Sequence, residues 1–597
     1  MRLDITGLQE AYRSGALTPA GLLGALLGRI AETGVQPVWI SVLDQAALDK
    51  RLERLEARRR AGEPLPLYGV PFAVKDNIDV AGLPTTAACP AFAYRPERSA
   101  AVIERLEAAG AIPLGKTNLD QFATGLNGTR SPYGAPSSVF DPAYISGGSS
   151  SGSAVAVAAG QVSFALGTDT AGSGRVPAAF NNIVGLKPSR GLLSNRGLVP
   201  ACRSLDCISI LAGSCADAAT VLAVAEGFDP EDSLSRRRPA TSVSLPAAFS
   251  FGIPAGPLDF CGDRDSERLY DEAVARLEFL GGRKAPIDFT PFASVARLLY
   301  QGPYVAERLA ALRGVGFTDW AAMDPTVAAI IQGAERFTAV EAFQAQYELA
   351  ALIRAAEPTW RSIDCLLLPT APTIFTHREM REDPIGRNSQ LGLYTNFVNL
   401  MDLSAIAVPA GFRSDGLPFG VTLVAPAFAE PGLLVLADAL HRALPDPRWG
   451  GTHEPLPPGA PPKPSSDRVT VAVVGAHLSG QPLNRQLVER GARLVRTTRT
   501  ASGYRLFTLP GTVPPKPGLI RDESGAGRIE IELWEMDHAA FGSFVALIPS
   551  PLGIGTLALE DGGRAQGFLC EPHALEGAED ITADGGWRAY LARAQGI

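Results

Sequence analysis

One lysine and two serines stand out in this sequence because of the segments that surround them. Lys75 follows VPFAV, Ser149 lies in GGSSSGS 74 positions later, and Ser173 lies in TDTAGS another 24 positions on. A serine hydroxyl attacks a carbonyl carbon only if a neighbouring base accepts its proton. Lysine is such a base only when neutral, and burial favours its neutral form because the protein interior disfavours charge. The pattern therefore predicts a serine nucleophile that depends on a buried lysine.

The residues next to these side chains indicate the elements that must position them. Val70, Phe72 and Val74 alternate ahead of Lys75, as in a half-buried strand that directs the ammonium group inward. The run VPAAFNNIV after Ser173 is helix-like, and the positive start of that helix would lie near the nucleophile. Glycines in both serine segments let the backbone pass close to a substrate and direct N–H groups at a developing oxyanion.

Two other catalytic patterns are excluded. The stretch GSSSG resembles a G-x-S-x-G nucleophile elbow, but the preceding DPAYIS is turn-like and no histidine after it lies nearer than His377. The S-x-x-K pattern of β-lactamases does not occur in the chain.

The three segments together resemble the amidase signature family of serine hydrolases, over roughly residues 5–445. The resemblance implies an α/β fold, with α/β/α layers built on a central mixed sheet. It also implies that Lys75 is the base, Ser149 a bridging serine in a cis peptide, and Ser173 the nucleophile. The oxyanion donors of the family correspond to the backbone of Thr170, Ala171, Gly172 and Ser173.

Further features resemble the allophanate hydrolase branch of that family. GGSSSGS replaces the common GGSSGGS, and TAGSGR replaces TGGSIR. Three further parts of the chain agree with this branch: residues 299–313, residues 391–412 and a C-terminal part that begins with GAHLSGQPLN. The resemblance implies hydrolysis of allophanate (urea-1-carboxylate) to ammonia and carbon dioxide by a cytoplasmic homodimer without a cofactor. It also implies either a functional partnership with a biotin-dependent urea carboxylase or a place in the breakdown of triazine-derived biuret.

A small anionic substrate needs a fixed cation, and Arg308 is the candidate for its carboxylate. Arg308 lies eight residues after Tyr300, about two helical turns, so both side chains could point to one side of the site. The planar guanidinium suits bidentate carboxylate binding, and the tyrosine can add a hydroxyl donor. In relatives this pair is associated with substrate recognition, and Gly125 would let the chain approach the small substrate.

Two other functions stay open at this point. The chain could be another amidase signature amidohydrolase with a different small amide substrate, its C-terminal part serving only in assembly. It could also be an assembly protein that binds a carboxylase through its C-terminal part and whose triad is inactive.

Composition limits the partners and sites that we expect. The 597 residues are 46% hydrophobic and 19% charged, which is typical of a globular protein with an ample core. The net charge of −8 argues against a nucleic-acid partner. The longest apolar stretch, residues 154–167, is interrupted and too short to span a membrane. Seven scattered cysteines and six histidines show no metal-ligand spacing, so no metal is expected.

A proline-rich stretch divides the chain. Eight prolines between Leu444 and Arg468 predict an extended linker, here 446–468, between a hydrolase domain (1–445) and a smaller α+β domain (469–597). The smaller domain resembles γ-glutamyl cyclotransferase-like folds, and the resemblance of the whole chain to allophanate hydrolases implies that this domain removes CO₂ from the N-carboxycarbamate product. His477, after a glycine turn, is its candidate catalytic residue. Candidate acid–base partners on the alternating segment 528–536 are Glu530, Glu532 and Glu535.

Overall fold

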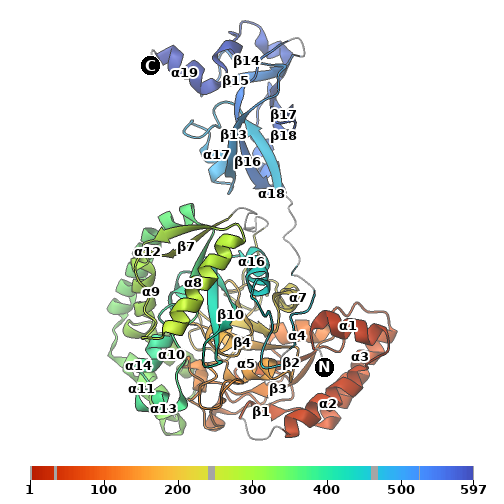
Figure 1. Ribbon diagram of the computed structural model, residues 1–597, viewed down its shortest axis with the longest axis vertical. Helices are drawn as coiled ribbons and strands as arrows, with labels where there is room; N and C mark the ends of the chain where they lie inside the picture. Colours follow the sequence, from red (N-terminus) through yellow and green to blue (C-terminus); the bar gives the residue numbers. More distant parts are fainter. Residues whose placement is uncertain are drawn as a thin grey trace. The chain divides into compact units, whose positions relative to one another are not determined.

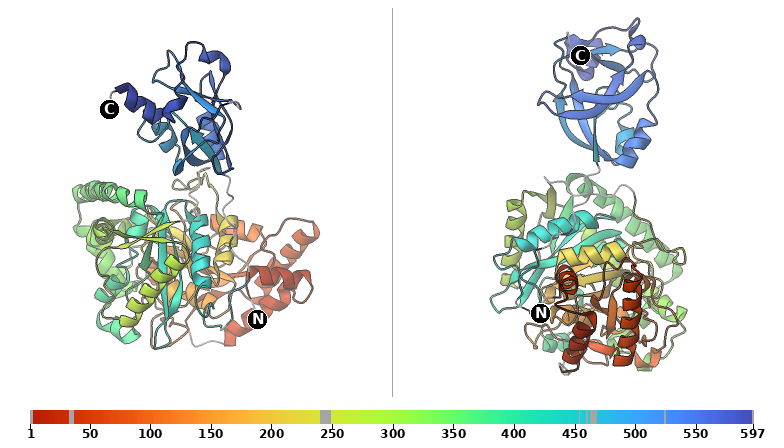
Figure 2. Two further views of the ribbon diagram at one scale, coloured as in Figure 1. Left: turned by 45° about the horizontal axis from the view of Figure 1, so that its top comes forward. Right: turned by 90° about the vertical axis from the view of Figure 1, so that its right-hand side faces the viewer.

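The computed structural model describes residues 3–32, 37–239, 249–452, 454–458, 461, 468–522 and 525–595. It divides into two compact units (Figures 1 and 2). The larger unit contains the described residues up to Arg238 and from Phe249 to Pro461, and the smaller unit is built mainly from the described residues after 467. In the part of the chain described here, no helix is both long and apolar enough to cross a membrane.

A mixed sheet of eleven strands forms the centre of the larger unit, in the order β1-β3-β2-β4-β6-β5-β10-β11-β9-β7-β8. β2 pairs in parallel with both β3 and β4, whereas β4, β6, β5, β10, β11 and β9 pair antiparallel in succession. This sheet confirms the predicted α/β class. The strands are β1 (Trp39–Val42), β2 (Pro71–Lys75), β3 (Ile112–Thr117), β4 (Phe164–Asp169), β5 (Val184–Lys187), β6 (Cys207–Ala212), β7 (Ser250–Pro254), β8 (Arg283–Ile287), β9 (Cys365–Pro369), β10 (Leu403–Phe412) and β11 (Pro418–Pro426).

Helices pack on both faces of this sheet (Figure 1). One face contacts α4, α7, α8 and α16, and the other contacts α5 and α6. The helices of the larger unit are α1 (Ile5–Arg13), α2 (Pro19–Glu32), α3 (Gln45–Arg60), α4 (Ala101–Ala108), α5 (Ser151–Ala158), α6 (Arg175–Phe180), α7 (Cys215–Ala225), α8 (Arg264–Phe279), α9 (Thr290–Gln301), α10 (Val305–Gly314), α11 (Pro325–Gln332), α12 (Ala339–Ser362), α13 (His377–Glu382), α14 (Gly386–Leu391), α15 (Phe397–Leu400) and α16 (Glu430–Arg442).

Strand β2 differs from the half-buried strand that its alternating sequence predicts. Every residue from Pro71 to Lys75 is buried, because helices cover both faces of the sheet at this position. Phe72 and Val74 belong to the core cluster beneath α4 and α7, whereas Ala73 belongs to the cluster beneath α5. The alternating sequence therefore assigned the side chains of β2 to the two faces of the sheet correctly, but both faces are buried.

The segment that carries Tyr300 and Arg308 forms two helices instead of one. Helix α9 ends at Gln301 and α10 begins at Val305, with Gly302 and Pro303 between them. Proline lacks an N–H and cannot continue the helical hydrogen-bond pattern. The predicted proximity of Tyr300 and Arg308 therefore cannot come from two turns of one helix.

A five-stranded sheet forms the centre of the smaller unit, in the order β13-β16-β12-β18-β17, and β14 pairs with β15 in a separate ribbon. The alternating segment 528–536 forms the inner strand β16, as its pattern predicts. The strands are β12 (Arg468–Val473), β13 (Arg493–Arg499), β14 (Tyr504–Thr508), β15 (Pro517–Arg521), β16 (Glu530–Asp537), β17 (Leu552–Ala558) and β18 (Arg564–Cys570). The helices are α17 (Arg485–Val488), α18 (His538–Val545) and α19 (Trp587–Gln595).

The predicted linker is shorter than its proline content indicates. Trp449 is 7% exposed and belongs to a core cluster of the larger unit. Gly450 donates its N–H to the Asn182 carbonyl at 2.8 Å, and Leu456 packs on the same cluster. The first part of the predicted linker therefore packs on the larger unit. Residues 453, 459–460 and 462–467 of the predicted linker lie outside the described residues.

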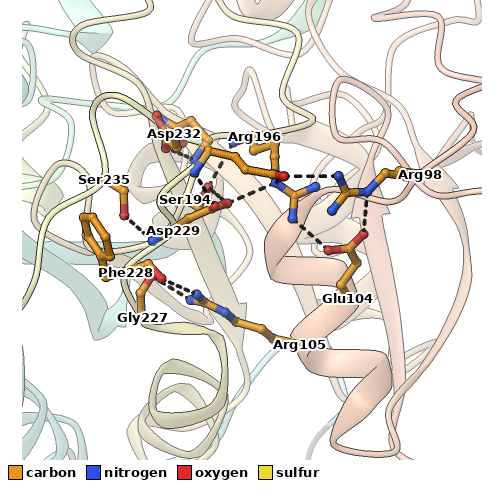
Figure 3. Close-up of polar contacts among 12 residues, drawn as sticks. Arg98, Glu104, Arg105, Ser194, Arg196, Gly227, Phe228, Asp229, Asp232 and Ser235 are labelled. Atoms are coloured by element: carbon orange, nitrogen blue, oxygen red, sulfur yellow. Dashed lines mark hydrogen bonds and ion pairs between the residues drawn. The ribbon is translucent and has the colours of Figure 1, made fainter.

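A polar network fixes the connection between β5 and β6 (Figure 3). Arg196 in this connection bonds Asp229 at 3.0 Å and Glu104 of α4 at 2.7 Å. Arg105, also on α4, donates to the carbonyls of Gly227 at 2.8 Å and Phe228 at 3.1 Å. The connection and the segment after α7 are thus both attached to one helix.

Candidate active site

The structure brings Lys75 and Ser149 into direct contact in the core of the larger unit. Lys75 Nζ lies 2.7 Å from Ser149 Oγ and 2.6 Å from Thr168 Oγ1, and all three side chains are buried. Lys75 is the last residue of β2, and Thr168 lies near the end of the neighbouring strand β4. The peptide bond between Gly148 and Ser149 is cis. Adjacent parallel strands thus deliver the lysine and the threonine to the same edge of the sheet.

Ser173 lies in the turn between β4 and α6 and is 2% exposed. Its hydroxyl donates to the Gly125 carbonyl at 3.3 Å, and its own carbonyl accepts the Ser150 N–H at 3.2 Å. The second bond joins the Ser173 segment directly to the residue that follows Ser149. Both serines predicted to react therefore lie in one buried cluster of loops, with Lys75 beneath them.

Burial lowers the pKa of Lys75 to about 7, because an ammonium group is poorly solvated in the interior. Three buried carboxylates act against this effect and raise the pKa: Asp120, Asp206 and Asp169. The charge of Arg308 lowers it further. A lysine with a pKa near neutrality can both accept and return a proton, which is the property that a general base requires.

Asp169 shapes the turn that carries Ser173. It accepts hydrogen bonds from the backbone N–H groups of Gly172 at 2.8 Å and Gly174 at 3.2 Å, and it binds Arg175 with two bonds of 2.9 and 3.0 Å. Burial alone would raise the pKa of Asp169, but the charge and hydrogen bonds of Arg175 lower it overall. A side chain at Gly172 would meet Thr395 Oγ1 at 2.4 Å, and the φ of 126° also favours glycine.

These contacts reduce the number of predicted oxyanion donors that are available to a substrate. The N–H of Gly172 is already donated to Asp169, so it cannot serve a substrate oxyanion in this conformation. The N–H groups of the other three donate no hydrogen bond to any described residue, although the residues are buried. Unsatisfied buried N–H groups are costly unless a ligand accepts from them. The remaining candidates are Thr170, Ala171 and Ser173.

Asp120 joins the loop of Gly125 to the loop of Ser149, a role that the sequence did not reveal. Its carboxylate accepts the N–H groups of Gly128 and Arg130, each at 3.0 Å. Its own N–H donates to the Ser149 carbonyl at 3.2 Å. A side chain at Gly125 would approach the Asp120 carboxylate to 2.5 Å, so this position needs glycine for close packing.

Arg308 and Tyr300 meet although they lie on separate helices. The guanidinium donates to Tyr300 Oη at 3.2 Å and to Thr124 Oγ1 at 2.9 Å, and its Cζ lies 5.4 Å from the centre of the tyrosine ring. Arg308 is 2% exposed, and no described carboxylate lies within ion-pair distance of it. Thr124 precedes Gly125, whose carbonyl accepts from Ser173. The structure thus holds a buried cation, without an ion-pair partner among the described residues, next to the loop that contacts Ser173.

Asp206 is a further buried acid that sequence reasoning missed. It accepts from Thr170 Oγ1 at 2.5 Å and from the N–H groups of Ala201 at 2.8 Å and Cys202 at 3.2 Å. Burial raises the pKa of Asp206 to about 6. The only sequence signal is a single aspartate ahead of the apolar segment CISILA, which by itself does not indicate contact with the loop of Ser173.

His477 lines a pocket of about 240 Å³ in the smaller unit, together with Gln486, Lys516 and mainly apolar residues. Its Nε2 lies 2.9 Å from Gln486 Oε1, and its ring stacks on Phe568 with centres 5.1 Å apart. Because an amide oxygen only accepts, this contact is a hydrogen bond in the tautomer that carries its hydrogen on Nε2. Burial lowers the pKa of His477, so the ring is neutral near pH 7.

The glutamates of β16 do not pair with His477. Glu532 is 2% exposed and binds Arg588, the backbone and hydroxyl of Ser479, and the Trp534 indole. Glu530 also pairs with Arg588, at 3.2 Å. Neither they nor Glu535 line the His477 pocket. The polar side chains that do line it, Gln486 and Lys516, were not singled out in the sequence.

Comparison with known proteins gives two family matches. The Amidase family model matches residues 22–434, and the Allophanate hydrolase C-terminal domain model matches residues 469–592. The chain is 44% identical to a urea amidolyase of Saccharomyces cerevisiae over 592 residues, which are 96% of this chain and 32% of that protein. It is also 44% identical to a urea amidolyase of Lachancea kluyveri, over 93% of this chain and 31% of that protein.

A solved structure agrees over both units. Selenomethionine-substituted allophanate hydrolase of Kluyveromyces lactis matches with a TM-score of 0.75 and 42% identity, over 98% of each chain. The urea amidolyase of the same organism matches with a TM-score of 0.73 and 42% identity, over 98% of this chain and 36% of the other. The chain thus spans about a third of the length of the urea amidolyases that it matches.

Proposed function

Because the chain belongs to the amidase family, and is an amidohydrolase, we propose that it hydrolyses allophanate to ammonia and carbon dioxide. Similarity to the K. lactis allophanate hydrolase over nearly the full length of both chains supports this substrate. The chemistry would be divided between the units: Ser173 in the larger unit releases the first ammonia, and the smaller unit decarboxylates the product.

The reaction begins with proton transfer toward Lys75. Neutral Lys75 takes the proton of Ser149, which in turn takes the proton of Ser173, and Ser173 Oγ forms a bond to the terminal amide carbon of allophanate. The Ser173 hydroxyl must first leave the Gly125 carbonyl and turn toward Ser149. The 2.7 Å bond between Lys75 and Ser149 supports the first transfer.

The carbonyl oxygen becomes an oxyanion as that bond forms. The N–H groups of Thr170, Ala171 and Ser173 stabilise this charge, because they lie in the nucleophile turn without other described partners. The C–N bond then breaks, and the leaving nitrogen receives the proton held by Lys75 through Ser149 and departs as ammonia. Water attacks the resulting acyl-enzyme by the reverse sequence of proton transfers, which frees Ser173 and N-carboxycarbamate.

The buried charge of Arg308 is the observation that carries the choice of substrate. A guanidinium taken out of water is costly without an anionic partner, and no described carboxylate pairs with it. A carboxylate in the substrate would satisfy it, while Tyr300 Oη donates a further hydrogen bond. Gly125, whose carbonyl accepts from Ser173, would lie beside the bound substrate.

The smaller unit would act on the dianionic product through His477. Loss of CO₂ from N-carboxycarbamate leaves an electron pair on nitrogen, which takes up a proton from solvent water to give carbamate. Carbamate then decomposes to ammonia and a second CO₂. Lys516 lines the same pocket and offers a positive charge to a carboxylate. The match of residues 469–592 to the allophanate hydrolase C-terminal domain supports a role in this reaction.

The source of the substrate points to a carboxylase as functional partner. Urea amidolyases are about three times as long as this chain and include a region that matches it. We propose that a biotin-dependent urea carboxylase supplies allophanate to this enzyme. A cytoplasmic location stays a prediction.

One assay tests the proposed substrate. Ammonia release would be measured side by side from allophanate, biuret, malonamate and a simple neutral amide. We expect the highest kcat/KM for allophanate, since it alone combines the small amide with the carbamate carboxylate. A preference for the neutral amide would favour another amidase activity. Failure of a fluorophosphonate to label Ser173 would favour an assembly protein with an inactive triad.

A further inference from the structure

The carboxylate of Asp206 is bonded to the start of the turn that carries Ser173. Thr170 follows the last residue of β4, and Asp206 precedes the first residue of β6. Because Asp169 pairs with Cys207 in this antiparallel ladder, Thr170 and Asp206 are the next two residues in register. Side chains that oppose each other across such a pair lie on the same side of the sheet, and Thr170 Oγ1 donates to Asp206 Oδ1 at 2.5 Å.

The same carboxylate also holds the end of the connection from β5 to β6. It accepts the N–H groups of Ala201 at 2.8 Å and Cys202 at 3.2 Å, and the Asp206 N–H donates to the Cys202 carbonyl at 2.9 Å. Asp206 is 3% exposed, and burial of a carboxylate is costly unless hydrogen bonds replace those to water. Cys202 also packs in one core cluster with Ala171. Asp206 therefore connects the beginning of the turn to a fixed segment of the core.

The two halves of the turn are held by different carboxylates. Its later residues are held by Asp169 and by the hydrogen bond between the Ser173 carbonyl and the Ser150 N–H. At its first two residues, the bond from Thr170 to Asp206 is the only hydrogen bond that a side chain forms within the described part of the chain. The N–H groups of these two residues are candidate oxyanion donors, so their direction depends on this one bond.

We propose that Asp206 is a positioning residue for amide hydrolysis: by holding the Thr170 hydroxyl, it keeps the N–H groups of Thr170 and Ala171 directed at the substrate oxyanion. Such donors are effective because they are fixed before the reaction, so that no free energy is spent on turning them in the transition state. The negative charge of Asp206 would by itself disfavour a nearby oxyanion, so we expect its benefit to come from the position of the donors. The inference rests on the oxyanion donors of the proposed function, but not on which amide is hydrolysed.

Steady-state kinetics of two variants of similar shape test this role in the full chain. Thr170→Val removes the hydroxyl but keeps the backbone N–H, and Asp206→Asn replaces one acceptor oxygen with an NH₂ group. Each should lower kcat roughly 10- to 100-fold with little change in KM, which is less than the about 10²- to 10³-fold loss for removal of a whole oxyanion donor. Thr170→Ser keeps the hydroxyl and should retain a kcat close to that of the wild type.

A double variant that combines Thr170→Val with Asp206→Asn shows whether the two residues act as a unit. If Asp206 acts through the Thr170 hydroxyl, the double variant should lose no more kcat than the more impaired single variant, because both changes break the same bond. Asp438→Asn is the matched control. It makes the same change at another buried carboxylate, 5% exposed on α16, and should keep the kcat of the wild type.

The pH profile separates the position of the donors from the charge of Asp206. That charge raises the pKa of Lys75, so Asp206→Asn should lower this pKa and move the acid limb of kcat/KM to lower pH. Thr170→Val keeps the charge and should leave the limb in place. The other charged groups that act on Lys75 are Asp120, Asp169 and Arg308. The kcat values are therefore compared on the alkaline plateau, where the lysine is neutral in every variant.

Three results would overturn the proposal: a wild-type kcat in Thr170→Val or Asp206→Asn, a loss confined to KM, or independent losses that multiply in the double variant. If Asp206→Asn does not fold, Thr170→Val and Thr170→Ser still decide whether the bond contributes to kcat. All rates are measured on the amide that the wild type hydrolyses fastest. A preference for an amide other than allophanate would thus contradict the proposed substrate without changing these ratios.

Discussion

Lys75 in the larger unit is fully buried and His477 in the smaller unit is half-buried, and the fold surrounds these two basic side chains differently. Three buried carboxylates offset the desolvation of Lys75 and leave its pKa at about 7. His477 is held by one amide and two phenylalanine rings, with no described carboxylate bonded to it. A strong base must lose several pKa units and needs nearby charge to limit that loss, whereas imidazole begins near neutrality. The intrinsic pKa of the base thus determines how much charge the fold must bury around it.

Ser173→Ala tests whether all chemistry begins in the larger unit. We expect ammonia release from allophanate to fall by on the order of 10⁴-fold or more, because no other group can form the acyl-enzyme. The His477 pocket should be unaffected. Steady-state ammonia assays measure the loss, and substantial residual turnover would mean that the smaller unit can start the reaction.

The pH dependence of activity tests the charge balance around Lys75. The lysine acts only when neutral, so lowering the pH through its pKa of about 7 should reduce kcat/KM, approaching about tenfold for each pH unit. Lys75→Ala should remove nearly as much activity as Ser173→Ala at neutral pH. A flat wild-type profile between pH 5 and pH 8, or an active Lys75→Ala enzyme, would contradict the mechanism.

Arg308→Ala tests the other buried charge of the larger unit. Loss of a desolvated charge pair typically costs about 2–5 kcal/mol, or roughly 30- to 5,000-fold in kcat/KM for allophanate. Hydrolysis of a neutral amide by the same variant should change much less, and Arg308→Lys should recover part of the loss. Equal losses on charged and neutral substrates would assign Arg308 a structural role.

Two truncations test how far the larger unit extends. A chain of residues 1–458 keeps Trp449, whereas one of residues 1–445 loses it and should unfold with about 3–5 kcal/mol less free energy, as for removal of a large buried aromatic side chain. Both proteins would be compared in urea. The longer one should still release the first ammonia. If it is folded but inactive, the two units must share one site.

His477→Ala should leave the release of the first ammonia unchanged and slow only the decarboxylation proposed for the smaller unit. N-carboxycarbamate should then accumulate at early times, before its spontaneous decay, and carbon-13 NMR of labelled allophanate would detect it. Ser173→Ala, which cannot form this intermediate, is the control. Identical early product profiles for wild type and His477→Ala would remove the catalytic role of His477.

Much of the larger unit's site was accessible from sequence because it depends on local patterns. The segments around Lys75, Ser149 and Ser173 predicted that these side chains meet. The structure brings Lys75 and Ser149 into contact and joins Ser173 to Ser150 through a backbone hydrogen bond, while the Ser173 hydroxyl bonds the Gly125 carbonyl. Long-range partners were not accessible: Asp120 and Asp206 are single acids whose contacts depend on the path of other loops. Tyr300 and Arg308 meet as predicted, but through a helix break that the two-turn argument ignored.

In the smaller unit the sequence indicated the elements better than the site. Alternation located β16, but its glutamates bind Arg588 and Ser479 and not His477. The pocket instead uses Gln486 and Lys516, whose sequence neighbourhoods are ordinary. At the linker, by contrast, the sequence indicated the element incorrectly. Its proline content predicted an extended segment at Trp449, but the structure packs this residue into the core of the larger unit.

Asp120 also has a consequence for how this sequence can change over generations. Side chains at Gly125 and Gly148 would both collide with its carboxylate, at 2.5 and 2.3 Å. A second mutation that shortened Asp120 could make room at Gly125, but it would remove the acceptor for Gly128 and Arg130. At Gly148 it would not make room, because the Gly128 backbone nitrogen would still lie 2.5 Å from the new side chain. Neither glycine can therefore be rescued by the obvious compensating change. We expect these three positions to drift least among lineages that keep the activity, and suppressor screens of glycine mutants at either site to return only reversions.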